Sequence, residues 1–406
     1  MAGRSRRIAI AYDCLFPFTK GGGERQYRAF AEEFVRQGYV VDYLTAAQGD
    51  GEVLSAPDFE VVTVAPRLRL YDEDGVRRTS AALVFAARLG WTLLRNRRRY
   101  RAVVVSGLPA LNVIAARVAL LGSGTRLVAD YLEVWRRRQW VEYTGGVVGT
   151  LAWIAQRIAI ALTPVATAHS ALSATRLRRE AFRGALLRSP GLIDASVERA
   201  GPSSDAADPP YVVYVGRHIP DKRVETIPAA VEYARRSIPD LRLVLLGKGP
   251  SSEAVRDAVR TADADEWTQM PGFVSDEELD RIVSAAACVV NPSRREGYGL
   301  VVVEAARHGV PVVLVADDGN AATELVEQNM NGLVAVSPAA EIMGQAIADV
   351  VLAGPELRSR TRAWYERARS ERTIEATIAQ LLLTLDPSNA PKQPPLETAP
   401  GGDQRD

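Results

Sequence analysis

Cysteine, lysine and long apolar runs are all scarce in this 406-residue chain. Cys14 and Cys288 are too few and too far apart to indicate a disulfide framework or a metal knuckle, so we expect a reducing compartment, the cytoplasm. No charge excess exists either, since 50 basic and 49 acidic residues leave a formal net charge of +1. A balanced charge gives no general attraction to nucleic acid, and we expect no such partner.

No segment has the character of a signal peptide or a membrane span. The basic N-terminus is followed by the short apolar run Ile8 to Tyr12, which Asp13 interrupts. The most apolar later stretch, Gly145 to Val165, carries Gln156 and Arg157 at its centre, where a bilayer would penalise them. A buried or interfacial helix is expected there.

The length predicts two domains, and the apolar pattern predicts that both are α/β. Short apolar runs alternate with helical patterns such as 24–37 and 80–95, which is typical of a doubly wound parallel sheet. The pattern pauses in a segment rich in Ser, Ala, Asp and Pro and then restarts. We therefore expect a first Rossmann-like domain over 1–194, a linker over 195–210, a second domain over 211–355, a long helix over 356–385 that packs back on the first domain, and a disordered tail over 386–406. The expected strands are 8–12, 40–44, 61–64, 102–105, 126–129, 211–215, 241–246, 287–290 and 310–315.

The segment from Asn291 to Glu304 carries the clearest chemical signal. It follows an expected strand, contains glycines and leads into an expected helix that ends near Gly309. Free backbone N–H groups and the positive end of a helix dipole meet at such a point, which favours an anion. Glu296 in the loop and Glu304 in the helix could each accept hydrogen bonds from sugar or ribose hydroxyls.

This segment resembles the Glu-x7-Glu motif of retaining GT-B glycosyltransferases of family 4. The resemblance implies two Rossmann-like domains facing a central cleft, with Glu296 against the transferred sugar and Glu304 against the nucleotide ribose. It also implies that Gly299 and Leu300, at the start of the helix, contact the donor.

Further motifs follow in family order, which makes the resemblance stronger than two glutamates at one spacing. Gly216-Arg217 with Lys222 is similar to the Gly-Arg-x4-Lys turn, in which the arginine and the lysine hold the donor diphosphate. Among 50 basic residues only Lys20, Lys222, Lys248 and Lys392 are lysine, so composition alone would place arginine at 222. The resemblance also implies donor contacts for two glycine loops and a base-lining segment: Gly21, Gly22, Gly23, Gly247, Gly249, Phe273 and Val274.

The first domain departs from the family pattern at one position. Many relatives have a histidine after a middle strand, near the reacting carbon, whereas this chain has Asp130-Tyr-Leu-Glu133 there. Asp130 and Glu133 are therefore candidates for contact with the acceptor. The arginine clusters 95–101 and 136–138 usually indicate a solvated face, and a peripheral contact with anionic lipid on the inner membrane face is the alternative.

We expect a retaining hexosyltransferase that uses a UDP- or GDP-sugar and a sugar, lipid-linked or natural-product acceptor, with no metal and no cofactor. The alternatives are a nucleotide-sugar epimerase of the same architecture and a noncatalytic sugar-nucleotide binding protein. A dinucleotide-dependent oxidoreductase would need Gly-x-Gly-x-x-Gly directly after a strand, and neither Gly21-Gly-Gly-Glu nor Gly247-Lys-Gly-Pro has that spacing.

Overall fold

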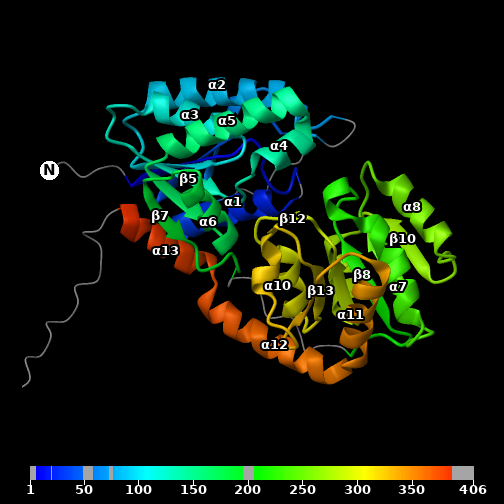
Figure 1. Cartoon of the computed structure of the whole chain (residues 1–406). Helices are drawn as coiled ribbons and strands as arrows, with labels where there is room; N and C mark the ends of the chain where they lie inside the picture. Colours follow the sequence, from blue (N-terminus) through cyan, green and yellow to red (C-terminus); the bar gives the residue numbers. More distant parts are fainter. Residues whose placement is uncertain (1–5, 20, 49–57, 73–75, 195–204, 386–406) are drawn as a thin grey trace, which may run out of the picture.

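The computed structural model describes residues 6–19, 21–48, 58–72, 76–194 and 205–385 and contains two parallel sheets, each covered by helices (Figure 1). The expected two-domain α/β fold is confirmed. Most of the expected linker, 195–204, and the whole expected tail, 386–406, lie outside the described residues.

The first domain is built on a seven-stranded sheet in the order β3-β2-β1-β4-β5-β6-β7, with every pair parallel. Its strands are β1 (Arg7–Ala11), β2 (Val40–Ala46), β3 (Glu60–Ala65), β4 (Ala102–Ser106), β5 (Arg126–Tyr131), β6 (Val165–Ala168) and β7 (Ala185–Arg188). Its helices are α1 (Gly22–Arg36), α2 (Thr79–Asn96), α3 (Ala110–Ala119), α4 (Arg137–Thr144), α5 (Gly146–Leu162) and α6 (Ala171–Arg179).

Alternation along the strands divides the core of this domain between the two faces of the sheet. Ile8 and Ile10 belong to the apolar cluster that contains Phe30 and Phe34 of α1. Ala9 and Ala11 point the other way, into a second cluster formed by residues of α2, α3 and α5. Strands buried on both faces are apolar throughout, which is why they were predictable from sequence.

The second domain has a six-stranded parallel sheet in the order β10-β9-β8-β11-β13-β15. Its strands are β8 (Tyr211–Val215), β9 (Arg242–Leu246), β10 (Thr268–Gly272), β11 (Cys288–Asn291), β13 (Val312–Val315) and β15 (Gly332–Ala335). Helices α7 (Ile227–Arg235), α8 (Ser252–Thr261), α9 (Asp276–Ala285), α10 (Leu300–Arg307) and α11 (Ala340–Leu352) cover it. The short strands β12 (Arg295–Glu296) and β14 (Gly319–Asn320) pair with each other in a separate two-stranded sheet.

The C-terminal region is two helices, where the sequence predicted one over 356–385. The first is α12 (Gly354–Glu371), which packs on α10, and the second is α13 (Ile374–Leu385), which packs on α1 and β7 of the first domain (Figure 1). The helix is broken at Arg372 because the chain there forms backbone hydrogen bonds with Ile193 and turns toward the first domain. Within the described residues, no helix is long and apolar enough to cross a membrane.

Candidate functional site between the two sheets

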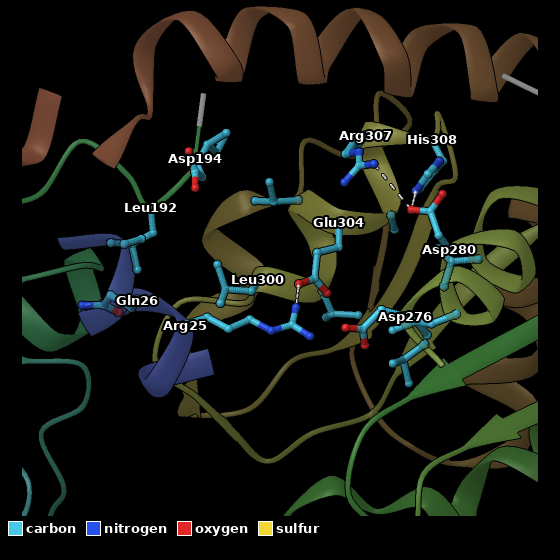
Figure 2. Close-up of a pocket in the computed structure, with 18 of the residues that line it drawn as sticks. Arg25, Gln26, Leu192, Asp194, Asp276, Asp280, Leu300, Glu304, Arg307 and His308 are labelled. Atoms are coloured by element: carbon cyan, nitrogen blue, oxygen red, sulfur yellow. Dashed lines mark hydrogen bonds and ion pairs between the residues drawn. The ribbon is translucent and has the colours of Figure 1, made fainter. Parts of the chain in front are cut away.

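A cleft of about 510 Å³ lies between the domains, with α1 on one side and α9 and α10 on the other (Figure 2). Its lining includes Arg25 and Gln26 of α1, Leu300 and Glu304 of α10, and Asp276 of α9. The carboxyl ends of both parallel sheets face this region, which is where ligands bind in doubly wound folds.

Two helix N-termini meet at the cleft. Gly21 is the residue that precedes α1, and a Cβ built on Gly22 would lie 3.3 Å from the Leu300 side chain, which begins α10. Gly299 has a φ of +102° and would place a Cβ 2.4 Å from that of Ala322, so only glycine fits there. Two helix starts this close favour an anion such as a diphosphate, and at α1 the Glu24 carboxylate already accepts a hydrogen bond from its own backbone N–H.

Glu296 and Lys222 form an ion pair at the end of the second sheet. The Lys222 Nζ donates to Glu296 Oε1, and Asn291 Nδ2 donates to the same oxygen at 3.0 Å. Burial alone would raise the pKa of Glu296, but the charge of Lys222 and hydrogen bonds from Lys222, Asn291 and Ser293 outweigh burial and lower it. Glu296 is therefore held as a carboxylate, and Lys222 is held beside it.

Arg217 extends from the turn after β8 toward the first domain. It is exposed, and its guanidinium lies over the ring of Tyr71 with a distance of 5.3 Å from Cζ to the ring centroid. A second loop, which contains Gly247 and Gly249, packs closely against this turn. A Cβ on Gly247 would lie 2.0 Å from the Gly216 carbonyl oxygen, and one on Gly249 would lie 2.3 Å from that of His218.

Glu304 makes an ion pair across the cleft. Arg25 Nη1 donates to Glu304 Oε1 at 2.8 Å, and both side chains remain partly exposed, at 39% for Arg25 and 48% for Glu304 (Figure 2). Glu296 and Glu304 therefore have different partners, Lys222 and Arg25. Arg25 was not singled out from the sequence, although its position in the first turn of the helix after the glycine loop could have marked it as a candidate.

Glu133 of the first domain lies against the Glu296 loop of the second domain. A Cβ on Gly297 would be 3.0 Å from Glu133 Cγ, so the two loops are in contact. Burial raises the pKa of Glu133 in spite of a hydrogen bond from the Trp135 indole and the charge of Arg295, and the charge of Glu296 adds to the rise. The first domain thus presents, beside Glu296, a carboxyl group with a raised pKa.

Asp130 has a different setting. Its side chain is buried and accepts hydrogen bonds from Gln26 at 3.0 Å and Tyr27 at 2.9 Å, and it also bonds Thr167 and His169. Both oxygens are used inside the first domain. This burial argues against the contact with an acceptor that the sequence suggested for Asp130.

The remaining predicted donor residues lie at the edges of this arrangement. Gly23 faces the Tyr12 hydroxyl, Val274 packs on the core, and Phe273 is 71% exposed. Within the described ranges, no three His, Cys, Asp or Glu side chains gather as metal ligands would. Metal independence stays a prediction.

Two further contacts join the domains beside the cleft. Glu324 accepts the backbone N–H groups of Ala171 at 2.7 Å and Leu172 at 2.8 Å, at the start of α6. Arg136 pairs with Asp318 at 2.6 Å. Such contacts, and Tyr71 against Arg217, could not be read from the sequence, since they depend on how the two domains face each other.

The family model for "Glycosyl transferases group 1" matches residues 199–370. The match covers the second domain and nearly all of α12, which together are less than half of the chain. The alpha-D-kanosaminyltransferase of Streptomyces kanamyceticus is 34% identical over 154 residues, which are 38% of this chain and 39% of that protein. A GDP-mannose-dependent alpha-(1-6)-phosphatidylinositol monomannoside mannosyltransferase of Mycobacterium tuberculosis is 29% identical over 150 residues, 35% of this chain and 38% of that protein.

The matched segments thus span about two fifths of the length of these curated relatives. The similarity to solved structures extends over the whole fold. The sucrose-phosphate synthase of Thermosynechococcus elongatus superposes with a TM-score of 0.78 at 18% identity, covering 94% of this chain and 99% of that one. The fold is that of the GT-B glycosyltransferases.

Proposed function

We propose that the chain is a retaining glycosyltransferase that moves a hexose-type sugar from a UDP- or GDP-sugar to an acceptor hydroxyl without a metal ion. The observation that carries this proposal is the Lys222–Glu296 pair, which lies at the end of the second sheet, in the region that the group 1 family model matches. It joins a cation suited to a phosphate with a carboxylate suited to a sugar hydroxyl.

The donor diphosphate would bind between the starts of α1 and α10. Arg217 can grip two phosphate oxygens with its planar guanidinium, and Lys222 adds a point charge. The N–H groups around Gly22 and Leu300 supply further donors. These groups stabilise the negative charge that grows on the diphosphate as the donor bond breaks. This stabilisation is the principal task of catalysis here.

The ribose would bind at Glu304, in the cleft of Figure 2. Its hydroxyls would take the place of Arg25 on the carboxylate. Domain closure over the donor would then exclude water, which would otherwise hydrolyse it.

In the transfer step, the bond from the anomeric carbon to the diphosphate oxygen breaks, and a bond from that carbon to the acceptor oxygen forms on the same face. The acceptor proton passes to the departing diphosphate. Glu296 would orient the sugar, and Glu133, which faces it from the first domain, would orient the acceptor hydroxyl.

The acceptor side includes a proposed contact with an anionic membrane at the inner face. The relative from Mycobacterium tuberculosis is named for a phosphatidylinositol monomannoside substrate, and a lipid-linked acceptor would need an enzyme that lies on the bilayer. A sugar or natural-product acceptor, of the kind that the name of the kanosaminyltransferase suggests, would not require the enzyme to lie on the bilayer.

The test is transfer activity in excess EDTA for the parent, Arg217→Ala and Lys222→Ala, with a thermal melt of each. Activity should persist in EDTA, and each variant should lose about 3–4 kcal/mol of transition-state stabilisation, several hundredfold in turnover. An enzyme silenced by EDTA and restored by magnesium, or one indifferent to both substitutions, would show that this donor site is wrongly assigned.

A further inference from the structure

We propose that the outer surface of the α2, α3 and α5 layer is the face by which this protein lies on an anionic lipid bilayer, with apolar side chains inserted between the headgroups. This inference rests on the proposed function, which includes a membrane contact, and it adds which surface of the protein makes that contact. The three helices form one layer over the first sheet, with α3 in contact with both others (Figure 1).

Helix α5 is apolar on the side that faces away from the protein. Its buried residues include Gln156, Ala159 and Ile160, which face the domain. Val147, Leu151, Ile154 and Ile158 recur at spacings of four, three and four residues and so form one stripe on the opposite side. All four are exposed, Leu151 at 61%.

Large apolar side chains are also exposed on the other helices of the layer. On α2, Leu83, Trp91 and Leu94 are exposed on the side opposite Phe85 and Leu89, which are in the core. The exposed large apolar residues of the layer are Leu83, Val84, Trp91, Leu94, Val118, Leu121, Val147, Val148, Leu151, Ile154 and Ile158. Exposed large apolar residues gathered on one layer of helices in this number point to an interaction site.

The charges of this layer are of one sign. No Asp or Glu occurs between Val76 and Ala129, a stretch that contains ten arginines, and none occurs in α5. Arg88 and Arg95 are exposed beside the α2 stripe, and Arg95 lies over the Trp91 ring at 4.8 Å. The protein as a whole is nearly neutral, so this face is a local concentration of positive charge.

Several arginines of the clusters expected from the sequence are held in ion pairs. Arg99 pairs with Asp42 at 3.3 Å and Arg136 with Asp318 at 2.6 Å, while Arg138 pairs with Glu142 at 2.7 Å. On α5 itself, Arg157 pairs with Glu180 at 3.2 Å. Within the described part of the chain, Arg88 and Arg95 of α2 and Arg98 just beyond it are exposed and form no ion pair, so the unpaired positive charge lies along α2, next to the apolar stripe.

An anionic bilayer fits both properties of the surface. Leucine, isoleucine and tryptophan side chains insert at the headgroup boundary, and arginines beside them extend to lipid phosphates. A second copy of the chain fits poorly, because two identical faces would bring arginines together with no acidic residue from either layer.

The experiment uses the full chain with vesicles of equal phosphatidylglycerol and phosphatidylcholine, or of phosphatidylcholine alone. Cosedimentation should occur with the anionic vesicles and weaken from 50 to 500 mM salt, and the neutral vesicles should bind less. The triple variant Arg88→Gln, Arg95→Gln, Arg98→Gln should lose on the order of a hundredfold in vesicle affinity, about fivefold for each arginine. Its control removes the same charge from the second domain, at Arg236, Arg242 and Arg260.

A second variant tests insertion. Leu151→Gln with Ile154→Gln and Ile158→Gln should lower vesicle affinity at least tenfold, while Val336→Gln with Leu352→Gln, on the second domain, should not. Trp91 fluorescence should shift to the blue and be quenched by brominated lipid, and a Trp91→Phe variant identifies its share.

The inference would be overturned if the control variants lost as much vesicle affinity as the test variants, or if the parent did not bind vesicles. It would also be overturned if the parent were a dimer that the α5 substitutions dissociate. Nucleotide diphosphate affinity, measured by calorimetry without vesicles, should be unchanged in all these variants. This affinity separates an error in the assigned membrane surface from an error in the proposed function. If the proposed function is wrong, the parent should show neither nucleotide binding nor transfer.

Discussion

Replacing Lys222 with Met should destabilise the second domain in a pH-dependent way. Met keeps most of the side-chain volume but leaves Glu296 without its cation, in a site where the Glu296 side chain is 16% exposed. Breaking a buried pair by removing one partner typically costs about 3–5 kcal/mol. Asn291 still donates to Glu296, and the site is not fully dry, so we expect about 2–3 kcal/mol, or roughly 5–10 °C in Tm.

The pH dependence follows from the pKa of Glu296. In the parent the pKa is lowered, so the pair stabilises the fold above the unfolded-state value of about 4.3 and loses that contribution as pH falls. Without Lys222, burial would raise the pKa above the unfolded value. The ionised group then destabilises the variant near neutral pH, and protonation relieves this as pH falls. The difference in Tm between parent and variant should therefore shrink from pH 8 to pH 5.

Thermal melts of the parent, Lys222→Met, Glu296→Gln and the double variant test this reasoning. The double variant should be more stable at pH 8 than Lys222→Met alone, because it has no uncompensated charge. A Tm difference that is constant from pH 8 to pH 5, or a double variant no more stable than Lys222→Met, would refute the account of this pair.

Four substitutions give separate tests of the donor site and of the contacts that support it. Glu304→Gln should weaken binding of the free nucleotide diphosphate by roughly 1.5–3 kcal/mol, whereas Glu296→Gln should lower turnover more than this affinity; equal losses in calorimetry would contradict the two roles. Gly247→Ala should cost about 2–4 kcal/mol in a melt, because φ is +106° and the new Cβ would meet the Gly216 oxygen at 2.0 Å; an unchanged Tm would show that the loops do not pack this way. Arg25→Met should change stability by less than about 1 kcal/mol, because its pair with Glu304 is exposed, and a larger loss by chemical denaturation would show that the pair holds the domains together.

Most of the fold was predictable from the sequence, because parallel strands buried on both faces leave apolar runs. The run 211–215 matches β8 in both bounds, and 40–44 lies within β2. In the two large sheets of the described residues, four strands were not predicted: β6, β7, β10 and β15. Val165–Ala168 has two alanines and a threonine, and Thr268–Gly272 contains a proline and ends in glycine, so neither has a strong β pattern.

The site was predictable only in part. Motif residues such as Lys222 and Glu296 follow strands or begin helices, and the sequence marks those positions. Their partners across the cleft, Arg25 and Tyr71, are an arginine among many and a tyrosine in a loop. Asp130 and Glu133 differ because the first domain encloses the Asp130 side chain, whereas Glu133 faces the Glu296 loop. The spacing of residues in the sequence does not predict which of the two is enclosed.

The return of α13 to the first domain makes that domain discontinuous in the chain. Ile374, Ile378, Leu381 and Leu385 are buried in the same core as the residues of β1 and α1. During synthesis, residues 1–194 leave the ribosome long before residues 374–385, so the first domain must wait with part of its apolar surface uncovered while the second domain folds. The half of the protein that is made first is therefore the half that is completed last.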